Sequence, residues 1–203
     1  MSKTLSEIDG IKLALGDMCI AWAHLEDDYF TLALYQFESF DSEISQALQS
    51  VLDIRDMAAL QKNTALARPR NIITDHLICL ADQIDKELRP VRNRFIHDPI
   101  FKFNDSYEFV DRTARIRKPQ AFKIEITFQN CSPASSERIE AFTKCIRCAH
   151  EYAGEIFGIL ECMDDAAKWG LPLGDQEARV LRANLAEAIA AYKEMTKSPE
   201  PKE

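Results

Sequence analysis

Apolar residues recur every three or four positions from residue 11 to residue 32, and this periodicity restricts the fold more than any other feature. The positions concerned are Ile11, Leu15, Met18, Trp22, Leu25, Tyr29 and Leu32. This spacing places the side chains on one face of an α-helix. A second apolar flank in the same segment consists of Leu13, Ile20, Phe30, Leu34 and Phe37. We therefore expect a long central helix that is contacted on two sides.

A second stripe of the same period continues through Pro90. It consists of Ile73, Leu77, Leu80, Ile84, Leu88, Val91 and Phe95. A proline inside a helix removes one hydrogen bond and clashes with the preceding turn. Because the apolar register continues beyond it, the pattern predicts one kinked helix over 71–98 rather than a break. Pro99 ends it, since the residue before a proline is biased away from helical geometry.

Three further segments have helical patterns. Residues 43–67 form one helix or two short ones, preceded by a loop in which Asp41 or Ser42 can cap the helix. The hydroxyls of "SPASSERIEAF" are suited to cap a long helix that runs to about Lys168 and is closed by Gly170 and Pro172. A last helix covers about 175–196, with an apolar side of Val180, Leu181, Leu185 and Ile189. The tail at 198–203 is expected to be disordered.

Residues 101–128 follow a different, alternating pattern. Apolar positions on one face of a strand are Phe122, Ile124, Ile126 and Phe128. Alternation of period two predicts strands, here a small antiparallel hairpin that turns near "KPQ". The expected fold class is therefore mainly α: an antiparallel four- or five-helix bundle with a small inserted β-hairpin at about 101–128, in a single domain over 1–197.

Composition and charge narrow the class of protein. The formal net charge is −8, so indiscriminate binding of polyanions is not expected. The polar N-terminus has no signal-peptide pattern and no apolar run has the length of a membrane span, which predicts a cytoplasmic protein without membrane association. The six cysteines, mostly among apolar neighbours, are interpreted as reduced core thiols. "CIRCAH" departs from the haem-attachment pattern and has no second pair for zinc, and His24 and His76 suggest no chemistry.

The end of the 71–98 helix carries the candidate site. On an ideal helix, Asn93 lies about 200° and His97 about 240° from Val91, so both face away from the core. Ile96, at about 140°, is an apolar residue on the outward side, and Arg92 lies on its edge. An imidazole can transfer a proton to or from a ribose phosphodiester, and a guanidinium can hold its phosphate. An asparagine one turn before the histidine can fix which ring nitrogen carries the proton. These groups together need no metal or other cofactor.

The pattern Arg92-Asn93-x-x-x-His97 resembles the Arg-x4-6-His signature of the HEPN superfamily, in which a polar residue commonly follows the arginine. The resemblance covers residues 10–165 as architecture and 92–97 as a motif. It implies a metal-independent endoribonuclease that acts as a homodimer, with a composite site in which an arginine of one subunit serves the histidine of the other. Arg92, Asn93 and His97 are then the catalytic residues.

The same interpretation gives the basic residues around the motif a role in binding the RNA substrate. These residues are Arg89, Arg94, Arg115 and Arg117. Between residues 86 and 123, ten Lys/Arg face five Asp/Glu, a net of +5 that leaves −13 for the rest of the chain. Such a basic segment can follow a nucleic-acid backbone. The alternative is a strand edge that its charges protect against aggregation.

Simpler interpretations remain open. Arg94 and Asp98, four apart, can form an exposed ion pair, Arg89 can be a solvated charge, and Asn93 with His97 can satisfy carbonyls at the helix end. The alternative function is a catalytically silent helical dimer that binds RNA or a protein, for example the antitoxin of a toxin or defence system. The complete set of motif residues favours the enzyme, and the acidity of the remaining chain favours the binding module.

Overall fold

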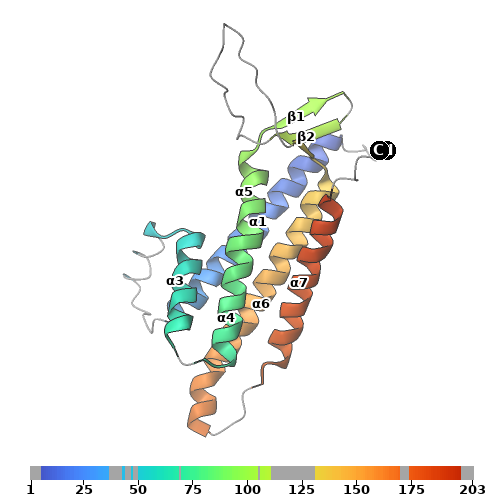
Figure 1. The fold of residues 1–203 in the computed structure, drawn as a ribbon. Helices are drawn as coiled ribbons and strands as arrows, with labels where there is room; N and C mark the ends of the chain where they lie inside the picture. The colour runs from blue at the N-terminus through green and yellow to red at the C-terminus, as the bar shows by residue number, and fades with distance from the viewer. Residues whose placement is uncertain are drawn as a thin grey trace, which may run out of the picture.

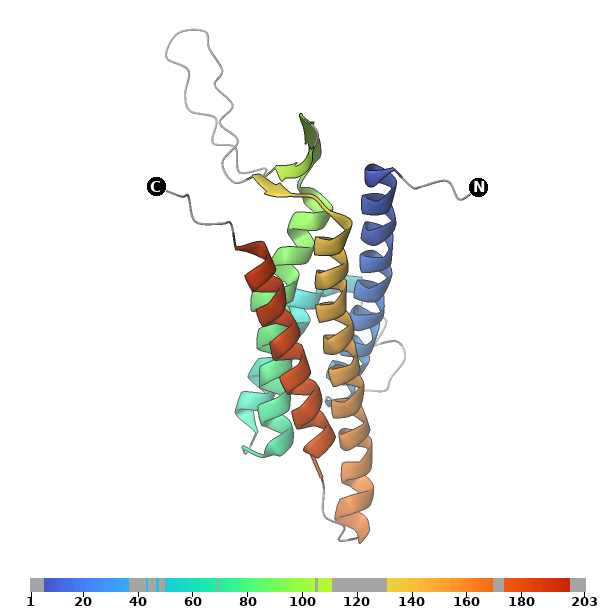
Figure 2. The same cartoon turned by 90° about the vertical axis from the view of Figure 1, so that its right-hand side faces the viewer.

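Two long helices form the centre of the protein. The computed structural model describes residues 6–36, 43, 47, 50–68, 70–104, 106–110, 131–169 and 174–197. Helix α1 (Glu7–Gln36) packs along α6 (Ser136–Trp169), and α7 (Gln176–Thr196) packs on the other side of α6 (Figures 1 and 2). The fold is mainly helical with a small antiparallel sheet, so the predicted fold class is confirmed.

The predicted stripe of α1 lies in the core. Of its seven positions, Leu15 is half-buried and the other six are buried. The second flank is correct only in part: Phe30 and Leu34 are buried, whereas Leu13 and Ile20 are 62% and 59% exposed. Phe37, the last residue of this flank, lies outside the described residues. The neighbours of α1 therefore cover less of its N-terminal half than the sequence suggests.

The predicted helix over 71–98 is continuous and contains a π-helical turn. It consists of α4 (Ile72–Gln83), the π-helix η1 (Ile84–Leu88) and α5 (Arg89–His97). At its start, Asn71 and Thr74 form a reciprocal capping box. The widened turn lies directly before Pro90, where an α-helical turn would bring the proline ring against a carbonyl. The π-helical turn therefore allows the helix to continue beyond Pro90.

The remaining helices agree with the predictions in outline. Leu52 and Asp53 are not helical, and Asp53 caps α3 (Ile54–Ala67), so residues 43–67 do not form one uninterrupted helix. Leu185 and Ile189 of α7 are buried, but Val180 is exposed, contrary to its predicted place on the apolar side. The expected cap at residues 41 and 42, the closing residues 170 and 172 and the tail at 198–203 lie outside the described residues.

The small sheet adjoins the end of the bundle at which α1 and α6 begin (Figure 2). Its order is β1-β2-β3, all antiparallel, with β1 (Ile100–Phe103), β2 (Ser106–Val110) and β3 (Cys131–Pro133). The first hairpin turns at Asn104, whose φ of 53° suits asparagine. This hairpin was not predicted from the sequence. The proposed turn at 118–120 and the strand at 122–128 lie outside the described residues.

The interpretation of the cysteines as core thiols is wrong for three of the six. Only Cys145 is buried, Cys79 and Cys148 are half-buried, and Cys19, Cys131 and Cys162 are exposed. Apolar sequence neighbours do not determine burial here, because on a helix the next residue lies about 100° away around the axis. Among the helices that the structure describes, none is long and apolar enough to cross a membrane.

Candidate functional site

One buried aromatic residue fixes the rotation of α5. The Phe95 ring lies 5.1 Å from that of Phe109 in β2 and 5.4 Å from that of Phe142 in α6, measured between centroids. Because Phe95 points inward, the next residues of the helix point outward. Ile96 is 37% exposed and His97 is exposed. The outward placement that the sequence predicts for these two residues is thus observed.

Arg92 lies at the edge of this outward face and is held in place by two neighbours. Its guanidinium carbon is 5.5 Å from the centroid of the Trp22 ring in α1, within the range of a cation–π contact. Its Nη1 donates a hydrogen bond of 3.2 Å to Oδ1 of Asn93. Arg92 and Asn93 are both half-buried. The arginine therefore lies along the α1–α5 contact rather than extending freely into solvent.

Glu26 in α1 interacts electrostatically with Arg92. Burial raises the pKa of Glu26, and this effect outweighs the opposing charge of Arg92 and a hydrogen bond from Trp22. The described residues nevertheless contain no Arg92–carboxylate pair within 4.0 Å. Since a guanidinium has five N–H donors and only one is used in the contact with Asn93, Arg92 retains donors for a further anion.

His97 is the last residue of α5, and its imidazole makes no hydrogen bond or ion pair with another described residue. The following residue, Asp98, closes the helix by donating its backbone N–H to the Arg94 carbonyl at 2.9 Å. The Asn93 amide oxygen accepts from Arg92, and the described chain has no hydrogen bond between the side chains of Asn93 and His97. A single chain does not bring Arg92 and His97 into contact, so the composite site between two subunits stays a prediction.

Two of the arginines predicted to bind substrate are already paired. Arg89 donates from Nε and Nη2 to Oδ1 of Asp85 at 3.0 and 2.8 Å, one turn earlier. Arg94 donates from Nε to Oδ2 of Asp98 at 3.2 Å, which confirms the ion pair that the sequence left open. Such pairs reduce the charge available to a phosphate. Arg115 and Arg117 lie outside the described residues.

Sequence reasoning missed Trp22 and Glu26 as neighbours of the motif. They are four apart and therefore lie on one side of α1. The position of Glu26 beside the apolar stripe of α1 can be read from the sequence. The packing of α5 against that side of α1 cannot.

A buried polar junction was also missed. His76 in α4 is almost fully buried; its Nδ1 lies 2.6 Å from the Tyr152 hydroxyl of α6 and its Nε2 lies 3.3 Å from Oδ2 of Asp175. Because a carboxylate only accepts, Nε2 carries the proton, and in the neutral ring Nδ1 accepts from Tyr152. Asp175 precedes α7 and also binds Arg179 at 2.6 Å. The junction joins α4, α6 and the start of α7.

The "CIRCAH" segment does not form a metal site in the part of the chain that is described. Burial raises the pKa of the Cys145 thiol to about 12, as expected for an inert core cysteine. His150 instead places Nε2 at 2.7 Å from Oδ2 of Asp28, and its ring lies 6.1 Å from that of His24. The described residues contain no group of three or more His, Cys, Asp or Glu side chains that could hold a metal ion.

Comparison of the chain with models of known protein families, with curated proteins and with solved structures found no match. The functional argument therefore depends on the residues of this chain.

Proposed function

We propose that this protein is a HEPN-like, metal-independent endoribonuclease whose active site combines α5 residues of two subunits. His97 of one subunit acts as the general acid or base, and Arg92 of the other holds the scissile phosphate and stabilises the charge of the transition state. Asn93 holds Arg92 through its amide oxygen, and its NH2 group is left to orient the histidine across the interface. No cofactor takes part in this scheme.

The observation that carries the proposal is the contrast between the two motif residues. Arg92 is held between Trp22 and Asn93 and retains unused donors, whereas His97 is exposed and has no partner in the described chain. Positioned cations and accessible imidazoles are the groups that phosphodiester cleavage needs. The resemblance of Arg92-Asn93-x-x-x-His97 to the HEPN signature supports the same activity independently of the geometry.

Single substitutions test the chemistry. His97→Ala and Arg92→Ala should each lower the rate of RNA cleavage by roughly 10²- to 10⁴-fold while the protein remains folded. The matched controls are His24→Ala and Arg55→Ala, which remove exposed residues of the same types from α1 and α3 and should leave the rate unchanged. The wild-type protein should cleave RNA at its full rate in EDTA and leave a 2′,3′-cyclic phosphate. It should not cleave DNA.

Mixed dimers test whether the site is composite. A heterodimer of His97→Ala and Arg92→Ala subunits retains one intact combination of arginine and histidine and should recover part of the wild-type rate. Recovery would not occur if each subunit carried a complete site of its own. Activity that depends on a divalent metal, or single variants as active as wild type, would contradict the proposed mechanism.

Ile96 provides a test of assembly. This exposed apolar residue lies between the motif residues, and a two-fold axis through α5 would bury it against its own copy. Ile96→Glu should raise the dimer dissociation constant at least about tenfold, because two carboxylates then meet in the interface. Sedimentation measures the dimer, and activity should fall in parallel. Ile20→Glu, an exposed isoleucine on α1, is the control.

A catalytically silent dimer that binds RNA or a protein such as an antitoxin is the second candidate. It is favoured by the pairing of Arg89 with Asp85 and of Arg94 with Asp98, which removes two cations from the motif surface. It predicts a dimer that is sensitive to Ile96→Glu but cleaves no RNA under any condition. Activity abolished by His97→Ala excludes it.

A further inference from the structure

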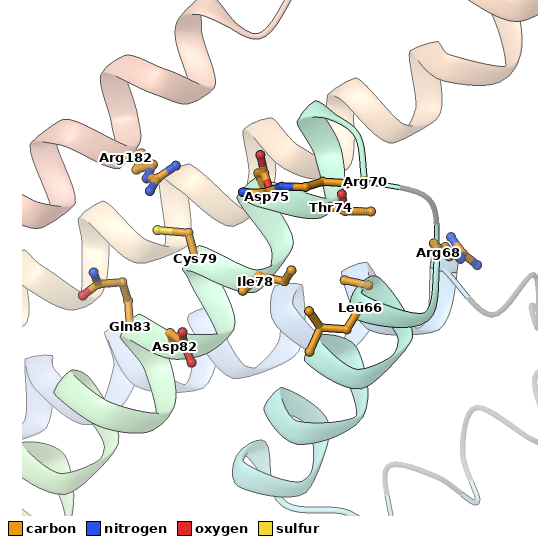
Figure 3. Close-up of a pocket in the computed structure, with 11 residues that line it drawn as sticks. Leu66, Arg68, Arg70, Thr74, Asp75, Ile78, Cys79, Asp82, Gln83 and Arg182 are labelled. Carbon is orange, nitrogen blue, oxygen red and sulfur yellow. The ribbon is translucent and has the colours of Figure 1, made fainter.

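A pocket of about 640 Å³ opens between the end of α3, the outer face of α4 and α7 (Figure 3). It contains no residue of the Arg92–His97 motif. Its volume is in the range of pockets that bind small molecules and cofactors. None of its residues entered the functional argument above, so its ligand is a separate question.

The pocket is basic in an acidic protein. Arg68, Arg70 and Arg182 line it together with Asp75 and Asp82. The two carboxylates are already neutralised. Asp75 accepts from Arg70 at 2.9 Å, and Asp82 accepts from two lysines, Lys62 at 2.7 Å and Lys86 at 3.1 Å. Three arginines and two carboxylates thus line the pocket, and both carboxylates have basic partners, whereas the whole chain has a net charge of −8. A local excess of positive charge of this kind favours an anionic ligand.

Arg182 is the cation best placed to bind that ligand. It comes from α7 and lies beside Cys79 of α4 in the pocket lining (Figure 3). Among the described residues, no carboxylate lies within ion-pair distance of it. A phosphate is a strong, charge-matched acceptor for a guanidinium, so Arg182 is suited to bind one.

The opposite wall of the pocket is apolar. Leu66 at the end of α3 is 61% exposed, and it faces Ile78 of α4 across the opening (Figure 3). An exposed leucine beside an isoleucine can cover the flat face of a base or another apolar ring. The pocket therefore combines an apolar wall with a basic rim, the two surfaces that a nucleotide needs.

The polar junction behind the pocket holds its inner surface in place. His76, one turn before Cys79 on α4, is buried and bonded to the hydroxyl of Tyr152. His76 in turn is bonded to Asp175 before α7. Because these bonds join α4, α6 and α7, the Cys79–Arg182 side of the pocket is formed before a ligand arrives, which lowers the entropic cost of binding.

We infer that this pocket binds a small phosphate-bearing ligand of the nucleotide class, with its phosphates at Arg182 and its apolar part against Leu66. The inference does not depend on ribonuclease activity, since binding to this pocket can be measured whether or not RNA is cleaved.

Calorimetry with ATP, GTP and inorganic pyrophosphate as probes tests the inference on the full chain. At least one nucleotide should bind with one site per chain and more tightly than pyrophosphate, because only the nucleotide can use the apolar wall. Arg182→Gln should weaken that binding at least about tenfold, the range for losing a charged hydrogen bond. Arg55→Gln, the same change on the exposed surface of α3, should leave it unchanged.

Thiol labelling locates the ligand. A saturating nucleotide should slow alkylation of Cys79 at least about fivefold relative to the exposed Cys162, as mass spectrometry of the labelled peptides would show. The inference is overturned if no probe binds at millimolar concentration, if Arg182→Gln and Arg55→Gln bind alike, or if Cys79 is not protected. Protection of Cys79 by a short RNA but by no nucleotide would overturn it in favour of a polymer site.

Discussion

Two histidines on one continuous helix lie in opposite environments. His76 in α4 is almost fully buried and both of its ring nitrogens have partners, Tyr152 and Asp175. His97, six turns later at the end of α5, is exposed and has no partner among the described residues. The first histidine joins three helices, and the second has both nitrogens available to a ligand or a second subunit.

The contrast shows how the two regions use polar groups. A buried polar side chain must be hydrogen-bonded, since a missing partner leaves its desolvation uncompensated. Partners of this kind make His76 part of the packing of the bundle. The outer face of α5 contributes little to the packing of one chain, so its residues are available for function. This distinction predicts large effects on stability in the junction and on the inner side of α5, and small effects on its outer face.

The largest loss of stability is expected for a substitution on the inner side of α5, and almost none for one on its outer side. Phe95→Ala removes a ring that packs between Phe109 and Phe142, and should lower the free energy of unfolding by about 3–5 kcal/mol. Ile96→Ala, one residue later, should change it by less than about 0.5 kcal/mol under conditions in which the chain is monomeric. Urea unfolding measures both. Similar losses for the two variants would mean that the outer face of α5 is covered within one chain.

Removal of the buried histidine should have the next largest effect. His76→Ala removes the side-chain partner of the Tyr152 hydroxyl and one of the two partners of Asp175, and it opens a small cavity, so the free energy of unfolding should fall by about 2–4 kcal/mol. His24→Ala, an exposed histidine of α1, should change it by less than about 0.5 kcal/mol. If His76→Ala were as stable as His24→Ala, the junction would not hold the helices together.

Acid should weaken the junction by a smaller amount. The hydrogen bond from Arg179, followed by that from His76, holds the pKa of Asp175 below its ordinary value of 3.8. A carboxylate with a lowered folded pKa contributes stability that is present above the unfolded pKa and is lost as the pH falls through the folded value. The urea midpoint should therefore decline below about pH 4, and less steeply in Asp175→Asn. Asp9→Asn, an exposed aspartate near the start of α1, should show the wild-type slope.

Much of the fold could be predicted because it follows from local periodicity. The stripe from Ile11 to Leu32 determines which face of α1 is buried, and the stripe through Pro90 correctly indicates a continuous helix. The outward position of Ile96 and His97 follows from the same arithmetic, because α5 is a regular helix from Arg89 to His97. In each case neighbours three or four positions apart carry the information.

The predictions failed where the outcome depends on which surfaces meet. The exposure of Leu13 and Ile20, of Val180 and of three cysteines depends on how much of each helix its neighbours cover. An apolar residue at a helical position is only suited to burial; a partner has to be there to bury it. The tight hairpin at Asn104 was not predicted, because the alternation over 101–128 indicates a single turn near Pro119.

The sequence by itself determined the helices, the passage through Pro90 and the outward exposure of His97 and Ile96, since these depend on dihedral preferences and on the helical repeat within one segment. Only the tertiary structure decided which charges are available. It placed Arg92 over Trp22, 70 residues earlier in the chain, paired His76 with Tyr152 and Asp175, and gave Arg182 in the pocket no ion-pair partner among the described residues. These contacts join residues far apart along the chain, and they exist only because packing of the helices brings those particular faces together.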